Sequence, residues 1–128
     1  MYEIPTHFGI PLSLTAVVLI LILLFYKRTF KSNYWKFWIS TAVFCLIYMF
    51  IVGSALMIDI EIRNDLMQFD LNNDGIFSIE ESTPVYKELM KRSVNDLGRN
   101  LSVYIGVIFS SILAVVAYLI LWVFQRLK

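Results

Sequence analysis

The pattern of apolar and polar positions divides the chain into three long apolar runs and one long polar interval. The apolar runs cover about residues 8–26, 38–58 and 101–124. A helix needs about 20 apolar residues to cross a hydrocarbon core of about 30 Å, and each run is long enough. We therefore predict an all-α integral membrane protein in which three transmembrane helices form one membrane domain over residues 1–128.

The polar interval, residues 59–100, begins with a pattern typical of a helix. Ile62, Leu66 and Phe69 recur at the spacing that places them on one helical face. Charged residues alternate with isoleucine over residues 59–63, which is also compatible with a short strand, but continuity with the apolar face favours a helix. We expect this helix to leave the membrane as a direct continuation of the second span.

Residues 70–81, in the middle of the polar interval, carry oxygen-bearing side chains at a regular spacing. These side chains stand at positions one, three, five, nine and twelve of the stretch and are Asp70, Asn72, Asp74, Ser78 and Glu81. Position six is Gly75, and glycine takes the positive φ of a sharp turn at little steric cost. Ca²⁺ prefers about six to eight oxygen ligands. The spacing therefore predicts a calcium site with Ca²⁺ as the cofactor.

This stretch resembles the calcium loop of the EF-hand superfamily, and the resemblance extends over about residues 60–92. It implies that Ile76 supplies its backbone carbonyl and that Glu81 binds through both carboxylate oxygens. The alternative is a surface turn without a metal, because Asn-Asn-Asp-Gly favours a tight turn by itself. The resemblance predicts a helix-loop-helix EF-hand between the second and third spans.

One residue departs from the family pattern: Pro84 lies within the expected exiting helix. Proline disfavours helical geometry at the preceding residue, Thr83, and removes a backbone donor. Either the exiting helix kinks here, or a new helix begins with Thr83 as N-cap and Pro84 as its first residue. A modest apolar face then continues to a helix end near Arg92, and a polar break surrounds Gly98.

The third apolar run carries a stripe of small residues. Gly106, Ser110 and Ala114 recur every four residues, and Ala117 lies close to the same face. Small residues allow another helix to approach closely within lipid. We expect this face to contact a neighbouring helix, either in the same subunit or in another one.

Composition supports the membrane assignment and excludes several function classes. Hydrophobic residues make up 59% of the chain and the mean hydropathy is +0.70, well above a soluble domain. No basic patch suits a nucleic acid, and no nucleophile with a base, metalloprotease motif or phosphate loop suggests an enzyme. The single cysteine, Cys45, lies within an apolar run and suits a small packing residue.

Charge is distributed unevenly along the chain and predicts an orientation. The connector between the first two spans and the C-terminus carry six cations and no acid: Lys27, Arg28, Lys31, Lys36, Arg126 and Lys128. Residues 59–100 carry nine acidic and five basic residues. The positive-inside rule therefore places the N-terminus and the EF-hand outside the cytoplasm and the C-terminus inside, in a plasma or inner membrane. The aromatic, basic connector suits either an interfacial anchor or a lipid-headgroup site.

Two functions remain compatible with these patterns. The first is a calcium-responsive homo-oligomer, such as a small ion channel or another membrane effector, assembled through the third span and through pairing of EF-hands between subunits. The second is an accessory subunit of a larger membrane complex in which calcium holds the external loop in shape. The lipid bilayer is a partner in both cases.

Overall fold

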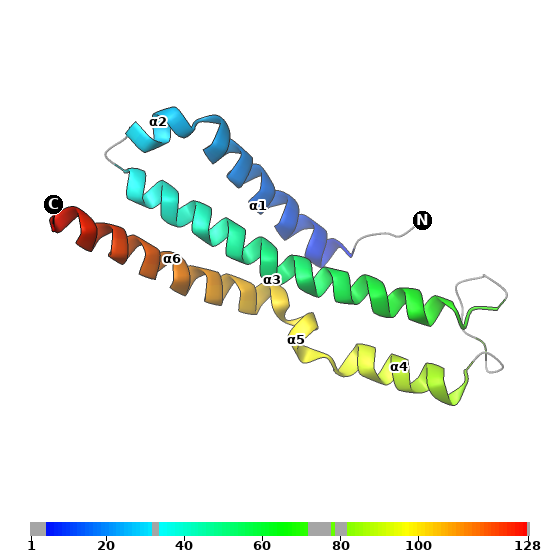
Figure 1. Ribbon diagram of the computed structural model, residues 1–128. Coiled ribbons are helices and arrows are strands. Elements are labelled where there is room, and N and C mark those ends of the chain that lie inside the picture. The colour runs from blue at the N-terminus through cyan, green and yellow to red at the C-terminus, as the bar shows by residue number, and fades with distance from the viewer. Residues whose placement is uncertain (1–4, 32–33, 72–77, 79–81, 128) are drawn as a thin grey trace. The chain divides into compact units, whose positions relative to one another are not determined.

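The computed structural model describes residues 5–31, 34–71, 78 and 82–127. Over these residues the regular elements are all helices, as predicted. They are α1 (Thr6–Leu24), α2 (Tyr26–Lys31), α3 (Trp35–Met67), α4 (Pro84–Asn95), α5 (Leu97–Asn100) and α6 (Ser102–Arg126) (Figure 1).

The chain forms two compact units. One consists of Met1–Gly53 with Ser102–Lys128, and the other of Ser54–Leu101. We call the first the membrane unit, because it contains α1, α2, α6 and the first part of α3. We call the second the hairpin unit, because it contains the last part of α3 followed by α4 and α5.

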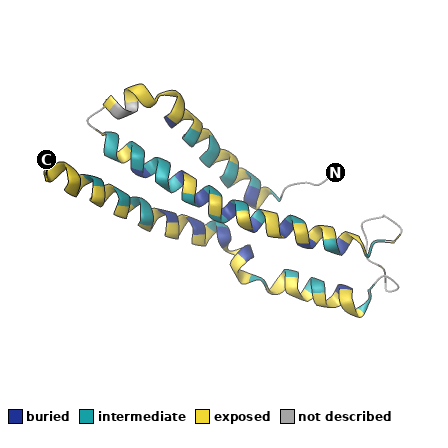
Figure 2. Ribbon diagram, viewed as in Figure 1, coloured by how far each residue is buried: buried dark blue, intermediate teal, exposed yellow. Residues whose placement is uncertain are grey.

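Three helices, α1, α3 and α6, are long and apolar enough to cross a membrane, which confirms the three predicted spans. Their bounds agree with the predicted runs to within a few residues, except that α3 continues far beyond the second run. Many large apolar residues of α1 and α6 are exposed, and Figure 2 shows exposed positions along both helices. In a bilayer these side chains face lipid, and the helical backbone satisfies its own hydrogen bonds.

The long helix α3 contains 33 residues without a break. At about 1.5 Å per residue it measures about 50 Å, whereas the hydrocarbon core is about 30 Å thick. Its last part includes the charged residues Asp59, Glu61 and Asp65, which belong outside the hydrocarbon. The continuous helix predicted from Ile62 and Leu66 is confirmed, and the alternative of a strand at residues 59–63 is wrong.

The small-residue stripe of α6 packs against α3 of the same chain. A Cβ added at Gly106 would lie 3.2 Å from Tyr48 Cε2 and 3.3 Å from Val52 Cγ2, so the two backbones approach closely here. Ser110 is fully buried, and Cys45 is also buried in the α3 part of this unit. The predicted helix contact is therefore made within the subunit.

The two helices run antiparallel. The start of α6, at Gly106, lies beside Tyr48 and Val52, and further along α6, Tyr118 lies across a groove from Phe37 near the start of α3. Between Phe37 and Tyr48 on α3 lies Phe44, whose ring stacks on that of Tyr48 with centroids 5.8 Å apart. Large rings on α3 thus oppose small residues on α6, which is the packing that lipid-embedded helices favour.

The connector between the first two spans contains a short helix of its own. Residues Tyr26–Lys31 form α2, a helix of six residues immediately after α1. The Lys27 ammonium lies 6.0 Å from the centroid of the Tyr26 ring. A cation beside an aromatic ring suits the headgroup region of a membrane.

Candidate functional site

The predicted calcium loop follows directly from the end of α3. The backbone N–H of Phe69 donates to the carbonyl of Leu66 at 3.1 Å, and that of Asp70 donates to the carbonyl of Met67 at 3.2 Å. These two bonds close the last turn of the helix. Asp70, the first predicted ligand, is therefore held at the helix end and is half-buried.

The described residues contain only part of the predicted ligand set. Asp70 and Ser78 are described, and Ser78 is exposed. Four other predicted ligands lie outside the described residues: Asn72, Asp74, Ile76 and Glu81. Within the described part of the chain, no group of three or more His, Cys, Asp or Glu side chains could hold a metal ion. The calcium site thus stays a prediction from the donor chemistry of residues 70–81.

The helix after the loop begins in the second of the two ways that Pro84 allows. Thr83 is the N-cap of α4, and its hydroxyl accepts a hydrogen bond from the Tyr86 backbone N–H at 3.2 Å. Pro84 occupies the first turn, where its missing N–H leaves no helical bond unmade. α4 thus begins after the predicted loop, and it continues to Asn95 rather than ending near Arg92.

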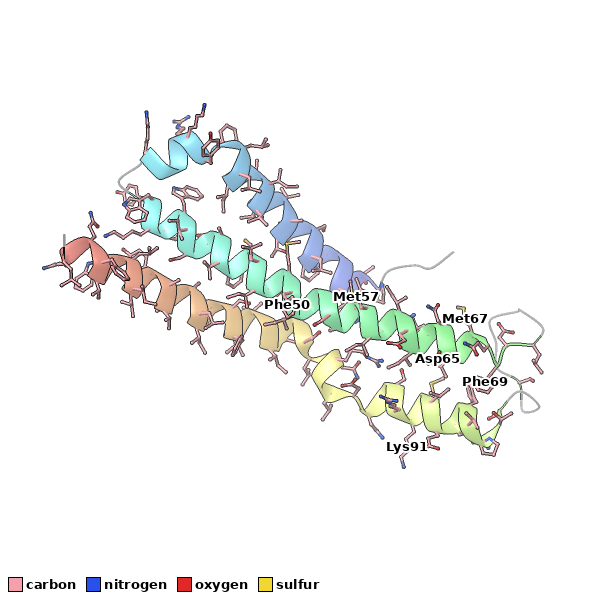
Figure 3. The ribbon with its side chains drawn as sticks, viewed as in Figure 1. Phe50, Met57, Asp65, Met67, Phe69 and Lys91 are labelled. Carbon is pink, nitrogen blue, oxygen red and sulfur yellow. The ribbon has the colours of Figure 1, made fainter. Side chains whose placement is uncertain are left out.

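An apolar cluster joins the two helices that flank the loop. Its buried members are Ile62 and Leu66 on α3 and Tyr86 on α4. Phe69, Leu89 and Met90 pack against them. Figure 3 shows Phe69 on the side of the chain that faces α4, whereas Lys91 points away from α3 on the opposite side of α4. The cluster holds the ends of the loop together.

An ion cluster stabilises the other end of the hairpin unit. Asp59 on α3 is buried, and its carboxylate accepts a hydrogen bond from Arg63 Nε at 2.7 Å and pairs with Arg99 Nε at 3.5 Å. Because Asp59 pairs with Arg99 while Leu66 packs near Tyr86, α4 and the last part of α3 run antiparallel.

Arg99 is the most enclosed charge in this cluster, with a side chain that is 4% exposed. Its Nη2 donates to the carbonyl and, at 3.2 Å, to the hydroxyl of Ser93 at the end of α4. Its backbone N–H donates to the Asp96 carboxylate at 3.0 Å, which caps the short helix α5. One guanidinium therefore connects α3, α4 and α5.

Sequence reasoning did not identify the ion cluster. The spacing of Asp59 and Arg63 predicts an i, i+4 pair on a helix, and that signal was present. Nothing in the local pattern pairs Asp59 with Arg99, because their contact depends on the antiparallel packing of α3 and α4.

Comparison with protein-family models, with curated proteins and with solved structures found no match.

Proposed function

We propose that this is a small calcium-binding membrane protein whose extracytoplasmic EF-hand couples Ca²⁺ to its transmembrane helices. The observation that carries the proposal is the calcium-loop pattern of residues 70–81 at the end of a helix that also forms the second span. The ligands would be Asp70, Asn72, Asp74, Ser78 and Glu81 through side-chain oxygens and Ile76 through its carbonyl.

The hairpin unit supports coupling because the loop joins two packed helices. α3 leads into the loop and α4 follows it, and the cluster of Ile62, Leu66 and Tyr86 holds the two helices against each other. In calcium sensors of this type, bound calcium gathers the loop oxygens and turns the flanking helices from a closed to an open arrangement. In this chain such a turn would separate Tyr86 from Ile62 and Leu66 and expose apolar surface.

The Asp59–Arg99 pair would hold the end of the hairpin unit that lies away from the loop in place during this movement. Because both side chains are buried, separating them would leave a charge without its partner, which costs about 3–5 kcal/mol in other proteins. The weaker apolar contacts near the loop would therefore yield first, and α4 would turn about its Arg99 end. Since α6 begins at Ser102, directly after Leu101, the turn would act on the start of the third span.

The loop chemistry suits a modest affinity on the outer side of a membrane. Only three formal negative charges would face the ion, those of Asp70, Asp74 and Glu81. Extracellular modules bind calcium with dissociation constants of about 10⁻⁴ to 10⁻³ M. With about 1 mM Ca²⁺ and a constant of about 10⁻⁴ M, binding stabilises the folded state by about 1.4 kcal/mol.

Replacing the residue at position twelve tests the calcium site. Glu81→Gln removes one charge and the bidentate closure of the coordination sphere, so we expect the calcium-dependent rise in melting temperature of the purified protein to disappear. Glu80→Gln is the matched control, because it removes the same charge at a neighbouring position that is not a predicted ligand. Circular dichroism should show unchanged helix content in both variants. Equal calcium-dependent shifts in the two variants would exclude this loop as the site.

A further inference from the structure

A groove of about 330 Å³ runs between α3 and α6 in the membrane unit. Phe37, Ser40 and Phe44 lie along its α3 wall, and Ser111, Ala114 and Tyr118 lie along its α6 wall. The hollow arises because small side chains, Ser111 and Ala114, stand opposite this part of α3. Its volume falls in the range of small-molecule sites, about 300–1,000 Å³. In a bilayer an acyl chain enters such a groove, since an empty one forfeits dispersion contacts.

The wall of the groove contains a buried hydroxyl that lacks a partner. Ser40 is 7% exposed, and its Oγ makes no hydrogen bond within the described part of the chain. Two nearby hydroxyls behave differently: Thr41 donates to the carbonyl of Phe37 at 2.9 Å, and Ser111 donates to that of Val107 at 2.7 Å. A buried hydroxyl without a partner is unfavourable in apolar surroundings. A ligand that brings an acceptor oxygen to Ser40 would remove this cost.

On each of the two helices that form the groove, a cation follows the lining residues at the same end. Lys36 precedes Ser40 by four residues and therefore lies on the same face of α3, about 6 Å further along the helix axis. On α6, Trp122 and Arg126 continue the face of Tyr118 at the same spacing. The guanidinium carbon of Arg126 lies 4.8 Å from the centroid of the Trp122 ring, four residues beyond Tyr118, which lines the groove.

No acidic partner for these cations lies in the described part of the membrane unit. Residues 5–53 and 102–127 contain no Asp or Glu. α2, the start of α3 and the end of α6 lie at the same end of the membrane unit (Figure 1), and the cations Lys27, Arg28 and Lys31 are on α2. Basic pockets between transmembrane helices bind anionic lipid headgroups.

We propose that this groove is a binding site for one anionic phospholipid. The phosphate lies beside Lys36 and Arg126, an ester carbonyl accepts a hydrogen bond from Ser40 Oγ, and an acyl chain lies between α3 and α6. A phospholipid carries phosphate, ester carbonyls and acyl chains in this order, which is the order of cation, hydroxyl and apolar groove along α3. The site is independent of the calcium loop.

Native mass spectrometry of the full chain in detergent tests the site, with equimolar dioleoyl phosphatidylglycerol and dioleoyl phosphatidylcholine as probes. We expect retention of one phosphatidylglycerol in preference to phosphatidylcholine. Lys36→Gln with Arg126→Gln should weaken its binding about fivefold for each cation removed, hence roughly 25-fold together. Lys27→Gln with Arg28→Gln is the matched control, because it removes the same charge at the same end but away from the groove walls, and should change binding little.

The acyl-chain part of the site needs a separate variant. Ala114→Leu fills the groove and should weaken binding of dioleoyl phosphatidylglycerol but not of dihexanoyl phosphatidylglycerol, which offers the same headgroup with short chains. Ser111→Leu replaces it if the first variant does not fold. Equal losses in the two charge variants would show diffuse attraction and overturn the proposal. Equal retention of the two dioleoyl lipids, or unchanged binding in the filled groove, would also overturn it.

Discussion

At the scale of single residues, Arg99 makes the contacts that join three helices of the hairpin unit. Its guanidinium pairs with Asp59 on α3 and donates to Ser93 on α4, and its backbone N–H is capped by Asp96. A buried charge is stable only while such partners are present. By contrast, Arg63 shares the same carboxylate but is half-exposed, so water can replace its partner.

We predict that Arg99→Ala lowers the free energy of unfolding by about 3 kcal/mol, because it leaves the Asp59 carboxylate buried with only one partner. Thermal unfolding in detergent measures the change. Arg92→Ala is the matched control on the exposed part of α4 and should stay within about 0.5 kcal/mol of the wild type. In an Asp59→Asn background the cost of Arg99→Ala should shrink. The same cost in both backgrounds would show that the ion pair does not contribute.

At the scale of helices, the contact between α3 and α6 depends on the absence of a side chain at Gly106. A Cβ there would already be tightly placed against Tyr48 and Val52. Gly53, which lies on α3, has open space around it instead: beyond its chain neighbours and the backbone of its own helix, no heavy atom lies within 4 Å of an added Cβ. The two glycines therefore differ in what a larger residue would meet, although both lie in helices.

We predict that Gly106→Leu destabilises the protein by about 2 kcal/mol, because overpacking forces α6 away from α3. Gly53→Leu should cause no comparable loss, since the added side chain enters open space. Thermal unfolding of the two variants in the same detergent gives the comparison. If both variants lose the same stability, the effect comes from the loss of glycine itself and not from the helix contact.

The boundaries of the helices follow local chemistry that the sequence already contains. Thr83 with Pro84 marks the start of α4, and Asp96 caps α5 near Gly98, where a polar break was expected. The sequence left open only whether Pro84 kinks a helix or begins one. Starting the helix at Pro84 leaves no helical hydrogen bond unmade, and this is the geometry observed.

At the scale of the whole molecule, the side of the membrane on which the hairpin unit lies is a prediction from charge. We expect Asn73→Cys, on a Cys45→Ala background that leaves a single thiol, to react with an impermeant maleimide in intact cells. Lys31→Cys on the same background should react only after permeabilisation, because Lys31 belongs to the basic connector. Protection of position 73 together with labelling of position 31 would reverse the orientation.

Oligomeric state distinguishes the two candidate functions. The small face of α6 is buried against α3 of the same chain, so subunits would have to meet through the outward, apolar face of α6 and through the predicted EF-hand. We expect an oligomer when mass is measured in nanodiscs with calcium, and a change in assembly with chelator, since pairing of hands requires an ordered loop. A monomer under both conditions would contradict self-assembly and favour an accessory subunit of a larger complex.

The sequence by itself determined the features that depend on local chemistry and on the thickness of a bilayer. Three apolar runs become three helices long enough to cross a membrane, and the face of Ile62 and Leu66 becomes the extension of α3. The calcium site of residues 70–81 is likewise a prediction from the sequence, and four of its predicted ligands lie outside the described residues.

Only the tertiary structure decided which distant residues meet. The Asp59–Arg99 pair, the contact of Gly106 with Tyr48, and the groove that Phe37 and Tyr118 line together all require antiparallel helices in a particular register. Periodicity predicts which face of a helix is apolar or carries small residues. It does not predict which other helix packs against that face. Register is set by the packing of large rings against small residues and by the pairing of buried charges, and both arise only when the helices come together.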